Sequence, residues 1–214
     1  MKREGSREFV AGPHIAGALD EIVAKLRDAG YLGGLSREAF AERAADLLAE
    51  LNAVHPFREG NGRTQRAFVE QLAQAAGHDL DFSVISKERM IAASIAAHDE
   101  NDLGPMRRLF ADAIDPARQE ALREVIDFFD RQQFPWNDRY IATVEPGHPV
   151  EVTFVGVAGD HFMARTGSQI LIGNVADLPD PQPERGQAFT LDPTHRRSRA
   201  NQGGRGGGAA GCDH

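Results

Sequence analysis

Hydrophobic side chains recur every three or four positions from residue 14 to about residue 132, which is the spacing of amphipathic helices. Glycine, serine and proline residues separate the segments at positions that suit helix ends. The predicted helices lie after residue 14, from Ser36 to Val54, from about Gly62 to Gly77, after Ser86, after Pro105 and after Pro116. In the third of them we expect Phe68 and Leu72 to face the core.

Beyond residue 136 the pattern changes to an alternation of apolar and polar side chains. In residues 150–154 the polar Glu151 and Thr153 alternate with apolar neighbours, which is the period of a strand. Turn-forming proline and glycine pairs separate the segments. Four strands are therefore expected, at residues 139–145, 149–157, 161–166 and 169–175. Together they would form a small all-β module over residues 137–178.

The last part of the chain differs from both regions in composition. From Pro179 onward proline, glycine and arginine dominate, and the segment ends in a glycine-rich run. Because such a composition buries too little apolar surface to fold, we predict a disordered tail at 179–214. The expected class is α+β, with a mainly helical domain at 1–115, a connecting helix and turn at 116–136, the β module and the tail.

The composition limits the classes of protein to which the chain can belong. Its 214 residues, 41% of them hydrophobic, are enough for one domain and a small second module. The net charge of -8 argues against a nucleic-acid partner, whose binding depends on lysine and arginine. The single cysteine, Cys212, excludes an intrachain disulfide, and no apolar run reaches the roughly 20 residues of a membrane helix. No secretory signal peptide is evident, so we expect a cytoplasmic protein in the producing cell, without a membrane partner.

Residues 55–66, with the sequence HPFREGNGRTQR, carry the strongest functional signal. The helix pattern places His55 at the end of one helix, and the next helix starts within the glycine-containing part of this segment. Free backbone N–H groups at a helix N-terminus bind anions. Gly60 and Gly62 allow the backbone to approach a phosphate closely, and Asn61 adds a side-chain donor.

Two arginines and a glutamate extend this pattern. Arg63 and Arg66 share one face of the first helical turn, where a positive charge is unfavourable by roughly 0.3–1 kcal/mol. A bound phosphate would reverse this effect, because guanidinium groups match phosphate oxygens. Glu59 beside that phosphate requires a cation, and Mg²⁺ bridges carboxylates and phosphates. His55 can accept a proton near neutral pH. Each feature alone has a structural interpretation, but their combination favours a phosphate site beside a general base.

These twelve residues resemble the signature of Fic-domain proteins, H-x-F-x-[D/E]-G-N-G-R-x-x-R, and match it at every defined position. The resemblance extends over roughly residues 6–112. It implies a protein adenylyltransferase, which transfers AMP from ATP to a Ser, Thr or Tyr hydroxyl of a target protein. It also implies that His55 is the general base, that Glu59 holds Mg²⁺ and that Phe57 is the buried anchor of the loop. Phosphate contacts are implied for Gly60, Asn61, Gly62, Arg63 and Arg66.

The residues before the first helix are similar to the flap of the family, a strand that pairs with the backbone of the target. The implied flap residues are Ser6, Arg7, Glu8, Phe9 and Val10. A phosphate-transferring branch of the family has lysine at the position of Gly62, so the glycine favours AMP transfer. The inhibitory pattern of the family, [S/T]-x-x-x-E-[G/N], does not occur in the sequence. We therefore expect any inhibitor to be a separate, antitoxin-like chain.

A Fic domain followed by a small OB-like module resembles effectors of type IV secretion systems, such as the Bartonella effector proteins. This resemblance implies delivery into a recipient cell. A β-hairpin packed on the helices is an equally good interpretation of the β module. The chain begins inside the flap, so a truncated and catalytically weak interaction module is an alternative function. Transfer of another nucleotide or phosphate moiety is a further alternative.

Overall fold

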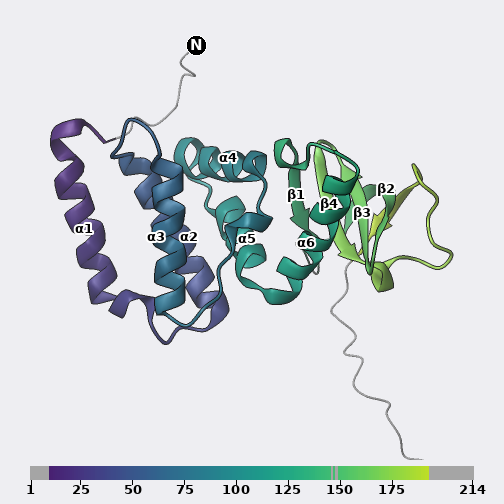
Figure 1. The fold of residues 1–214 in the computed structure, drawn as a ribbon, viewed down its shortest axis with the longest axis horizontal. Coiled ribbons are helices and arrows are strands. Elements are labelled where there is room, and N and C mark those ends of the chain that lie inside the picture. The colour runs from purple at the N-terminus through teal and green to yellow at the C-terminus, as the bar shows by residue number, and fades with distance from the viewer. Residues whose placement is uncertain (1–9, 146, 148, 193–214) are drawn as a thin grey trace, which may run out of the picture.

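The computed structural model describes residues 10–145, 147 and 149–192 of the chain. In this part of the chain six α-helices come first and five strands follow, which confirms the α+β class. The helices are α1 (Ile15–Asp28), α2 (Arg37–Val54), α3 (Asn61–Ala75), α4 (Lys87–Ile95), α5 (Gly104–Ile114) and α6 (Pro116–Arg131). The strands are β1 (Tyr140–Thr143), β2 (Val150–Ala158), β3 (His161–Thr166), β4 (Gln169–Asn174) and β5 (Ala188–Leu191). In Figure 1 the first five helices lie at one end of the molecule and the sheet at the other, with α6 between them.

Serine side chains cap the starts of α2 and α4 at the positions that the sequence predicts. The Ser36 hydroxyl accepts a hydrogen bond from the Ala39 N–H at 3.3 Å, and the Ser86 hydroxyl accepts one from the Arg89 N–H at the same distance. Each cap contributes about 1 kcal/mol, because it satisfies a helix N–H that has no partner within the helix. Pro116 is the first residue of α6. These boundaries therefore follow from local capping chemistry.

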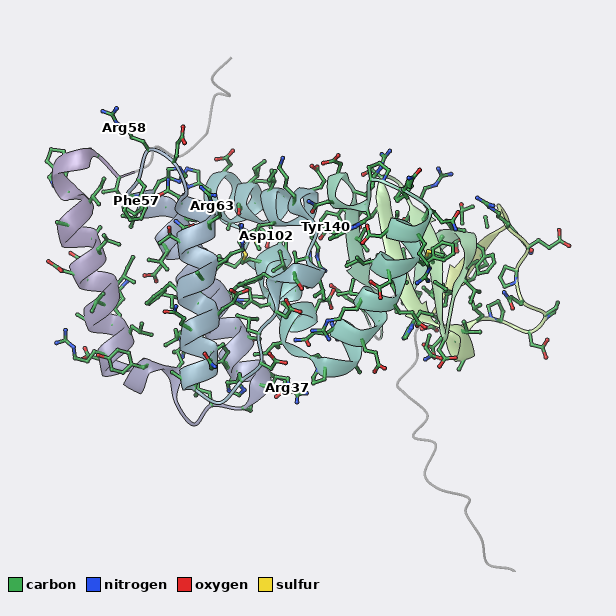
Figure 2. The ribbon with its side chains drawn as sticks, viewed as in Figure 1. Arg37, Phe57, Arg58, Arg63, Asp102 and Tyr140 are labelled. Atoms are coloured by element: carbon green, nitrogen blue, oxygen red, sulfur yellow. The ribbon has the colours of Figure 1, made fainter. Side chains whose placement is uncertain are left out.

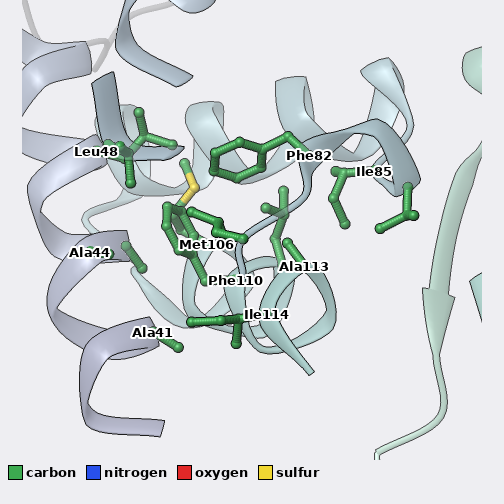
Figure 3. Close-up of a cluster of buried hydrophobic side chains, with 14 of the residues drawn as sticks. Ala41, Ala44, Leu48, Phe82, Ile85, Met106, Phe110, Ala113 and Ile114 are labelled. Atoms are coloured by element: carbon green, nitrogen blue, oxygen red, sulfur yellow. The ribbon is translucent and has the colours of Figure 1, made fainter. Parts of the chain in front are cut away.

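One hydrophobic core extends through the helices. Figure 3 shows its centre, where side chains of α2, the segment 82–85 and α5 meet: Ala41, Ala44, Leu48, Phe82, Ile85, Met106, Phe110, Ala113 and Ile114. The rings of Phe82 and Phe110 pack edge to face with their centres 5.2 Å apart. The helices contribute one apolar face each to this core. Among the described residues, none forms a helix with the length and hydrophobicity needed to cross a membrane.

The predicted inward face of α3 is partly wrong. Leu72 is buried as expected, but the Phe68 side chain is 39% exposed. The face that packs against α2 instead carries Val69, which is fully buried, and begins with the buried polar residues Asn61 and Gln65. These three residues lie four positions apart, so they share one side of the helix. The hydrophobic pattern missed this face because two of its members are amides.

Helix α6 does more than connect the two halves of the molecule. The buried residues of its inner face include Leu122, Val125, Ile126 and Phe129. They belong to the same core as Ile141 of β1, Met163 of β3 and Ile172 of β4. Helix α6, which the sequence predicted as a connecting helix, therefore covers one face of the sheet and fixes the sheet to the other helices. Burial of four large apolar side chains stabilises this contact by several kcal/mol, at roughly 1.5–3 kcal/mol each.

The sheet is mixed, with the strand order β1-β4-β3-β2-β5. Strand β1 is parallel to β4, and the other neighbours are antiparallel. A small β-hairpin is therefore the wrong interpretation of this region. Five strands match the number in an OB-fold, and β1 and β5 form the two edges of the sheet in the described part of the chain.

Strand β5 also corrects the predicted start of the disordered tail at residue 179. Residues 188–191 pair with β2, and Leu191 is 1% exposed within a second apolar cluster on the sheet. Composition alone could not predict this strand, because a short edge strand is stabilised by its partner rather than by its own sequence. Residues 193–214 of the predicted tail lie outside the described residues.

A buried network of charges links three helices to the first strand. Arg89 of α4 donates to Asp112 of α5 at 2.7 Å, and both side chains are 2% exposed. Arg118 of α6 also donates to Asp112, at 2.9 Å. Thr143 of β1 donates to the same carboxylate twice, from its backbone N–H at 3.0 Å and from its hydroxyl at 2.6 Å. Each oxygen of Asp112 thus accepts two hydrogen bonds, and we call this set the Asp112 network.

The Asp112 network keeps its carboxylate ionised. Burial by itself would raise the pKa of Asp112, but the charge of Arg89 and the hydrogen bonds from Thr143 and Arg118 outweigh burial. The pKa of Asp112 is therefore held below its ordinary value of 3.8. The guanidinium carbon of Arg89 also lies over the ring of Tyr140, 5.8 Å from the ring centre.

Candidate active site

His55 is the residue at which α2 ends. Its backbone has φ 48° and ψ 57°, which is the left-handed conformation, and its N–H donates to the Leu51 carbonyl at 3.3 Å. For a residue with a side chain this conformation costs roughly 1–2 kcal/mol, so the surrounding contacts must hold it. The result is that the chain turns sharply after α2 and that the half-buried His55 lies at the turn.

The loop from residue 56 to residue 60 is closed by a reciprocal pair of hydrogen bonds. The Phe57 N–H donates to Asn61 Oδ1 at 2.9 Å, and Asn61 Nδ2 donates back to the Phe57 carbonyl at 2.6 Å. Asn61 is 4% exposed, so water does not compete for these bonds. Gly60 precedes α3 with φ 84°, a conformation that glycine adopts without strain. The side chain of Asn61, predicted to contact phosphate, is thus engaged with the loop itself.

Arg63 and Arg66 fold back over the start of α3. A Cβ atom built on Gly60 would lie 3.8 Å from Arg63 Nη2, and one built on Gly62 would lie 3.2 Å from Arg66 Nη1. The structure therefore brings two guanidinium groups and the free N–H groups of a helix N-terminus to one place. An anion with several oxygens is the ligand that this combination favours, since both features attract negative charge.

Glu59 is exposed in the same loop. In the part of the chain that the structure describes, no group of three or more His, Cys, Asp or Glu side chains gathers in a way that could hold a metal ion. A single carboxylate is nevertheless what a Mg²⁺ site needs when substrate phosphates supply the other ligands. The donor set therefore fits a metal that arrives with a phosphate and not a permanent metal centre.

One expectation about the neighbouring side chains is wrong. The Phe57 ring is 51% exposed, so the predicted buried anchor of the loop is wrong, and the backbone of Phe57 performs that role through Asn61. Arg58 is exposed and points away from the helices (Figure 2). A depression of about 430 Å³ runs along α3 beside Arg63, where Phe68 forms part of its lining.

Most of the predicted flap precedes the described residues. Ser6, Arg7, Glu8 and Phe9 lie outside the described residues. Val10 lies within them, and its N–H donates to the carbonyl of Ala53 at 3.3 Å, two residues before His55. The end of the flap segment is therefore next to the end of α2.

Sequence reasoning missed one residue near this site. Gln65 is 7% exposed, and its Nε2 donates to the Leu51 carbonyl at 2.9 Å. That carbonyl is the one that also accepts the N–H of His55. Gln65 occupies an undefined position of the signature, so the resemblance gave it no role. The available signal was its spacing, four residues after Asn61 and four before Val69.

Comparison with known proteins places this geometry in a family. A model of the Fic/DOC family matches residues 4–73, which include the whole signature. A protein adenylyltransferase of Bartonella henselae is 40% identical over 183 residues, which are 85% of this chain and 34% of that protein. The protein adenylyltransferase VbhT of Bartonella schoenbuchensis is 44% identical over 78 residues, 36% of this chain and 16% of VbhT. The chain thus spans about a third or less of the length of these two relatives.

One solved structure agrees over a longer stretch, and a second agrees over about half of the chain. The type IV secretion system effector protein BepA superposes with a TM-score of 0.84 at 38% identity, over 91% of this chain and 67% of BepA. BepC from Bartonella tribocorum, solved with bound AMPPNP, has a TM-score of 0.51 at 44% identity, over 54% of this chain and 56% of BepC. With the signature intact at the junction of α2 and α3 and the same fold over two thirds of BepA, the chain belongs to the Fic/DOC family.

Proposed function

We propose that this chain is a protein adenylyltransferase, which transfers AMP from ATP to a Ser, Thr or Tyr hydroxyl of a target protein. The observation that carries the proposal is the position of Arg63 and Arg66 over the glycines at the start of α3, one short loop away from His55. A base beside a polyphosphate site is the minimum that this transfer requires. The relatives named as adenylyltransferases and those solved with AMPPNP and ADP support it.

In the proposed reaction His55 accepts the proton of the target hydroxyl. The hydroxyl oxygen forms a bond to the α-phosphorus of ATP while the bond from that phosphorus to the bridging oxygen breaks, and pyrophosphate leaves. Arg63 and Arg66 hold the β- and γ-phosphates, and the N–H groups of residues 60–62 face the α-phosphate as its charge shifts. Positioning and charge stabilisation supply most of the rate gain in such a transfer.

Glu59 would hold Mg²⁺ beside the phosphates of ATP. The ion, when bound, neutralises phosphate charge and orients the leaving group. Gly62 favours AMP transfer over phosphate transfer, because the phosphate-transferring branch of the family has lysine at this position. A Cβ atom built on Gly62 would lie 3.2 Å from Arg66 Nη1. A longer side chain there would displace that guanidinium group.

The proposed partner is a protein that presents a hydroxyl side chain beside the flap, residues 6–10, whose last member Val10 contacts the end of α2. A separate antitoxin-like chain is the proposed inhibitor. Several relatives are described as VirB-translocated effectors of Bartonella. We therefore also propose that this chain, or the protein that contains it, is delivered into a recipient cell by a type IV secretion system.

The test is incubation of the purified chain with Mg²⁺, a cell lysate and ATP that carries the label either on the α- or on the γ-phosphate. We expect a protein band that appears only when the chain is added, and that carries the α-label but not the γ-label. The variant His55→Ala should lose the band, because removal of a general base lowers the rate by about 10² to 10⁴-fold. His14→Ala is the matched control, since His14 is exposed and lies outside the signature.

The outcomes separate the alternatives. A γ-labelled band that appears with the wild-type chain and not with His55→Ala would mean phosphate transfer, and equal α-labelling by wild type and His55→Ala would sink the proposal. If there is no label and calorimetry detects no binding of Mg-ATP, the interaction module becomes the better hypothesis.

A further inference from the structure

The buried polar side of α3 lies against the end of α2. Three residues spaced by four positions form this side, and all of them are buried: Asn61 at 4%, Gln65 at 7% and Val69 at 0% exposure. Asn61 is bonded to the backbone of Phe57 in the loop. Gln65, one turn further on, is bonded to the carbonyl of Leu51 in α2. The first two turns of α3 are therefore tied by side-chain amides to the segment that carries His55.

The bond from Gln65 falls on a carbonyl that matters for His55. Leu51 lies in the last turn of α2, and its carbonyl is the one that accepts the N–H of the C-cap residue His55. Its oxygen accepts the N–H of His55 at 3.3 Å, a long hydrogen bond, and Gln65 Nε2 at 2.9 Å, a shorter one. The Leu51 carbonyl thus accepts both the hydrogen bond that closes the last turn of α2 and a hydrogen bond from the Gln65 side chain of α3.

The location of Gln65 links the two halves of the site. Gln65 is the neighbour of Arg66, whose guanidinium group lies over Gly62, and its amide reaches across to the turn that presents His55. A hydrogen bond between two helices fixes both a distance and an orientation, which apolar packing of a side chain of the same length does not. His55 needs such support, because it has a left-handed backbone that only its surroundings can maintain.

We propose that Gln65 is a positioning residue: its hydrogen bond to Leu51 holds His55 at a fixed distance from the phosphate-binding start of α3. Gln65 does not touch the reacting atoms and acts through the end of α2. The proposal rests on the proposed AMP transfer, and it adds a residue that the family signature leaves undefined.

The test compares two buried glutamines of the same chain. Gln65→Met keeps the length of the side chain and removes the amide. Gln119→Met is the matched control: Gln119 is 2% exposed in α6, and its Nε2 donates to the carbonyl of Ala113 at 2.7 Å, far along the chain from the signature. Gln65→Met loses one hydrogen bond to a backbone carbonyl. Gln119→Met loses two such bonds, to Ala113 and to Asp79 at 3.2 Å, and the bond that Gln119 Oε1 accepts from Arg123. A merely structural role therefore predicts at least as large a change in Gln119→Met as in Gln65→Met.

We expect Gln65→Met to lower kcat by at least about tenfold, because a small misplacement of a catalytic group is enough for such a loss. Its KM for ATP should stay close to that of the wild type, since the arginines and the helix N-terminus are intact. Gln119→Met should keep the wild-type kcat at temperatures where it is folded. If Gln65→Met retains the wild-type kcat, or if both variants lose the same share of it, the positioning role is refuted.

A second readout does not depend on activity. The backbone amide and ring resonances of His55, assigned with His55→Ala, should shift or broaden in Gln65→Met and stay in place in Gln119→Met. Absence of AMP transfer in the wild type would therefore refute the proposed function and leave the positioning role to be decided by these resonances. Unchanged His55 resonances in Gln65→Met would overturn the positioning role of Gln65. If that variant does not fold, Gln65→Asn replaces it, since its amide is one methylene too short to reach Leu51.

Discussion

The signature segment, residues 55–66, and the Asp112 network are both built from charged and polar groups, but the groups find their partners in opposite ways. In the Asp112 network the carboxylate and Arg89 are both 2% exposed, and each carboxylate oxygen accepts two hydrogen bonds within the protein. In the signature segment Glu59 and Arg63 are exposed, and two backbone positions are left-handed. One region pairs its charged groups inside the protein, and the other leaves charged groups exposed, as the proposed nucleotide site requires.

This difference shows where the chain stabilises itself and where it gives up stability. Like charges at a helix N-terminus and a left-handed histidine are unfavourable in the free protein. They persist because a few buried bonds, chiefly those of Asn61, fix the loop. The Asp112 network, by contrast, ties α4, α5, α6 and β1 together and so joins the helices to the sheet. We expect mutations in the two regions to separate stability from activity.

The largest effect on stability is expected for Asp112→Asn. This change leaves the buried Arg89 charge without its counterion, and breaking one side of a buried pair costs about 3–5 kcal/mol. Urea unfolding followed by the fluorescence of Trp136, the single tryptophan, measures it. The matched control is Asp46→Asn, which breaks the exposed pair with Arg107 and should cost no more than about 1 kcal/mol. Equal losses of free energy of unfolding in the two variants would mean that the Asp112 network stabilises the protein no more than a surface ion pair does.

A pH dependence follows from the same carboxylate. The folded-state pKa of Asp112 is lowered, so its stabilising contribution is complete above the ordinary value of 3.8 and is lost as the pH falls through the folded-state pKa. The free energy of unfolding of the wild type should therefore decrease more steeply below this value than that of Asp112→Asn. Urea midpoints measured for both proteins between neutral and acid pH provide the comparison, and parallel curves would contradict it.

A smaller effect is expected for Gly60→Ala. At φ 84° an alanine is strained by roughly 1–2 kcal/mol, and the start of α3 would shift away from the Asn61 contacts. We expect reduced transfer activity together with this loss of stability. Gly17→Ala is the control, because Gly17 lies within α1 with open space around it, and alanine there should stabilise the helix by about 0.5–1 kcal/mol. Thermal melts of both variants, with labelling assays, test the pair.

The smallest effect is expected for Phe57→Ala. Because the ring is 51% exposed and the loop is held by the Phe57 backbone, the free energy of unfolding should change by no more than about 0.5 kcal/mol. Phe40→Ala, at a fully buried phenylalanine of α2, should cost about 3–5 kcal/mol. Denaturant midpoints of both variants measure these changes. If Phe57→Ala lost nearly as much free energy of unfolding as Phe40→Ala, Phe57 would be a buried anchor after all.

Much of the helical part could be predicted from the sequence because its signals are local. The serine caps at Ser36 and Ser86 act on the next three residues, and the stripe from Phe40 to Val54 fixes the buried face of α2. Strands β2, β3 and β4 have an alternating pattern with turns between them, so their positions were also predictable. Strand β5 was not, because its four residues gain their hydrogen bonds from β2.

The candidate site divides in the same way. The order of residue types in HPFREGNGRTQR determined by itself that a histidine, a carboxylate, two glycines and two arginines would lie at a junction between helices. Only the tertiary structure decided that Phe57 faces solvent, that Asn61 holds the loop and that Gln65 reaches Leu51. The physical reason is that residue types and their spacing fix local conformation and chemistry, whereas the burial and partners of an amide depend on which neighbouring helix packs against it.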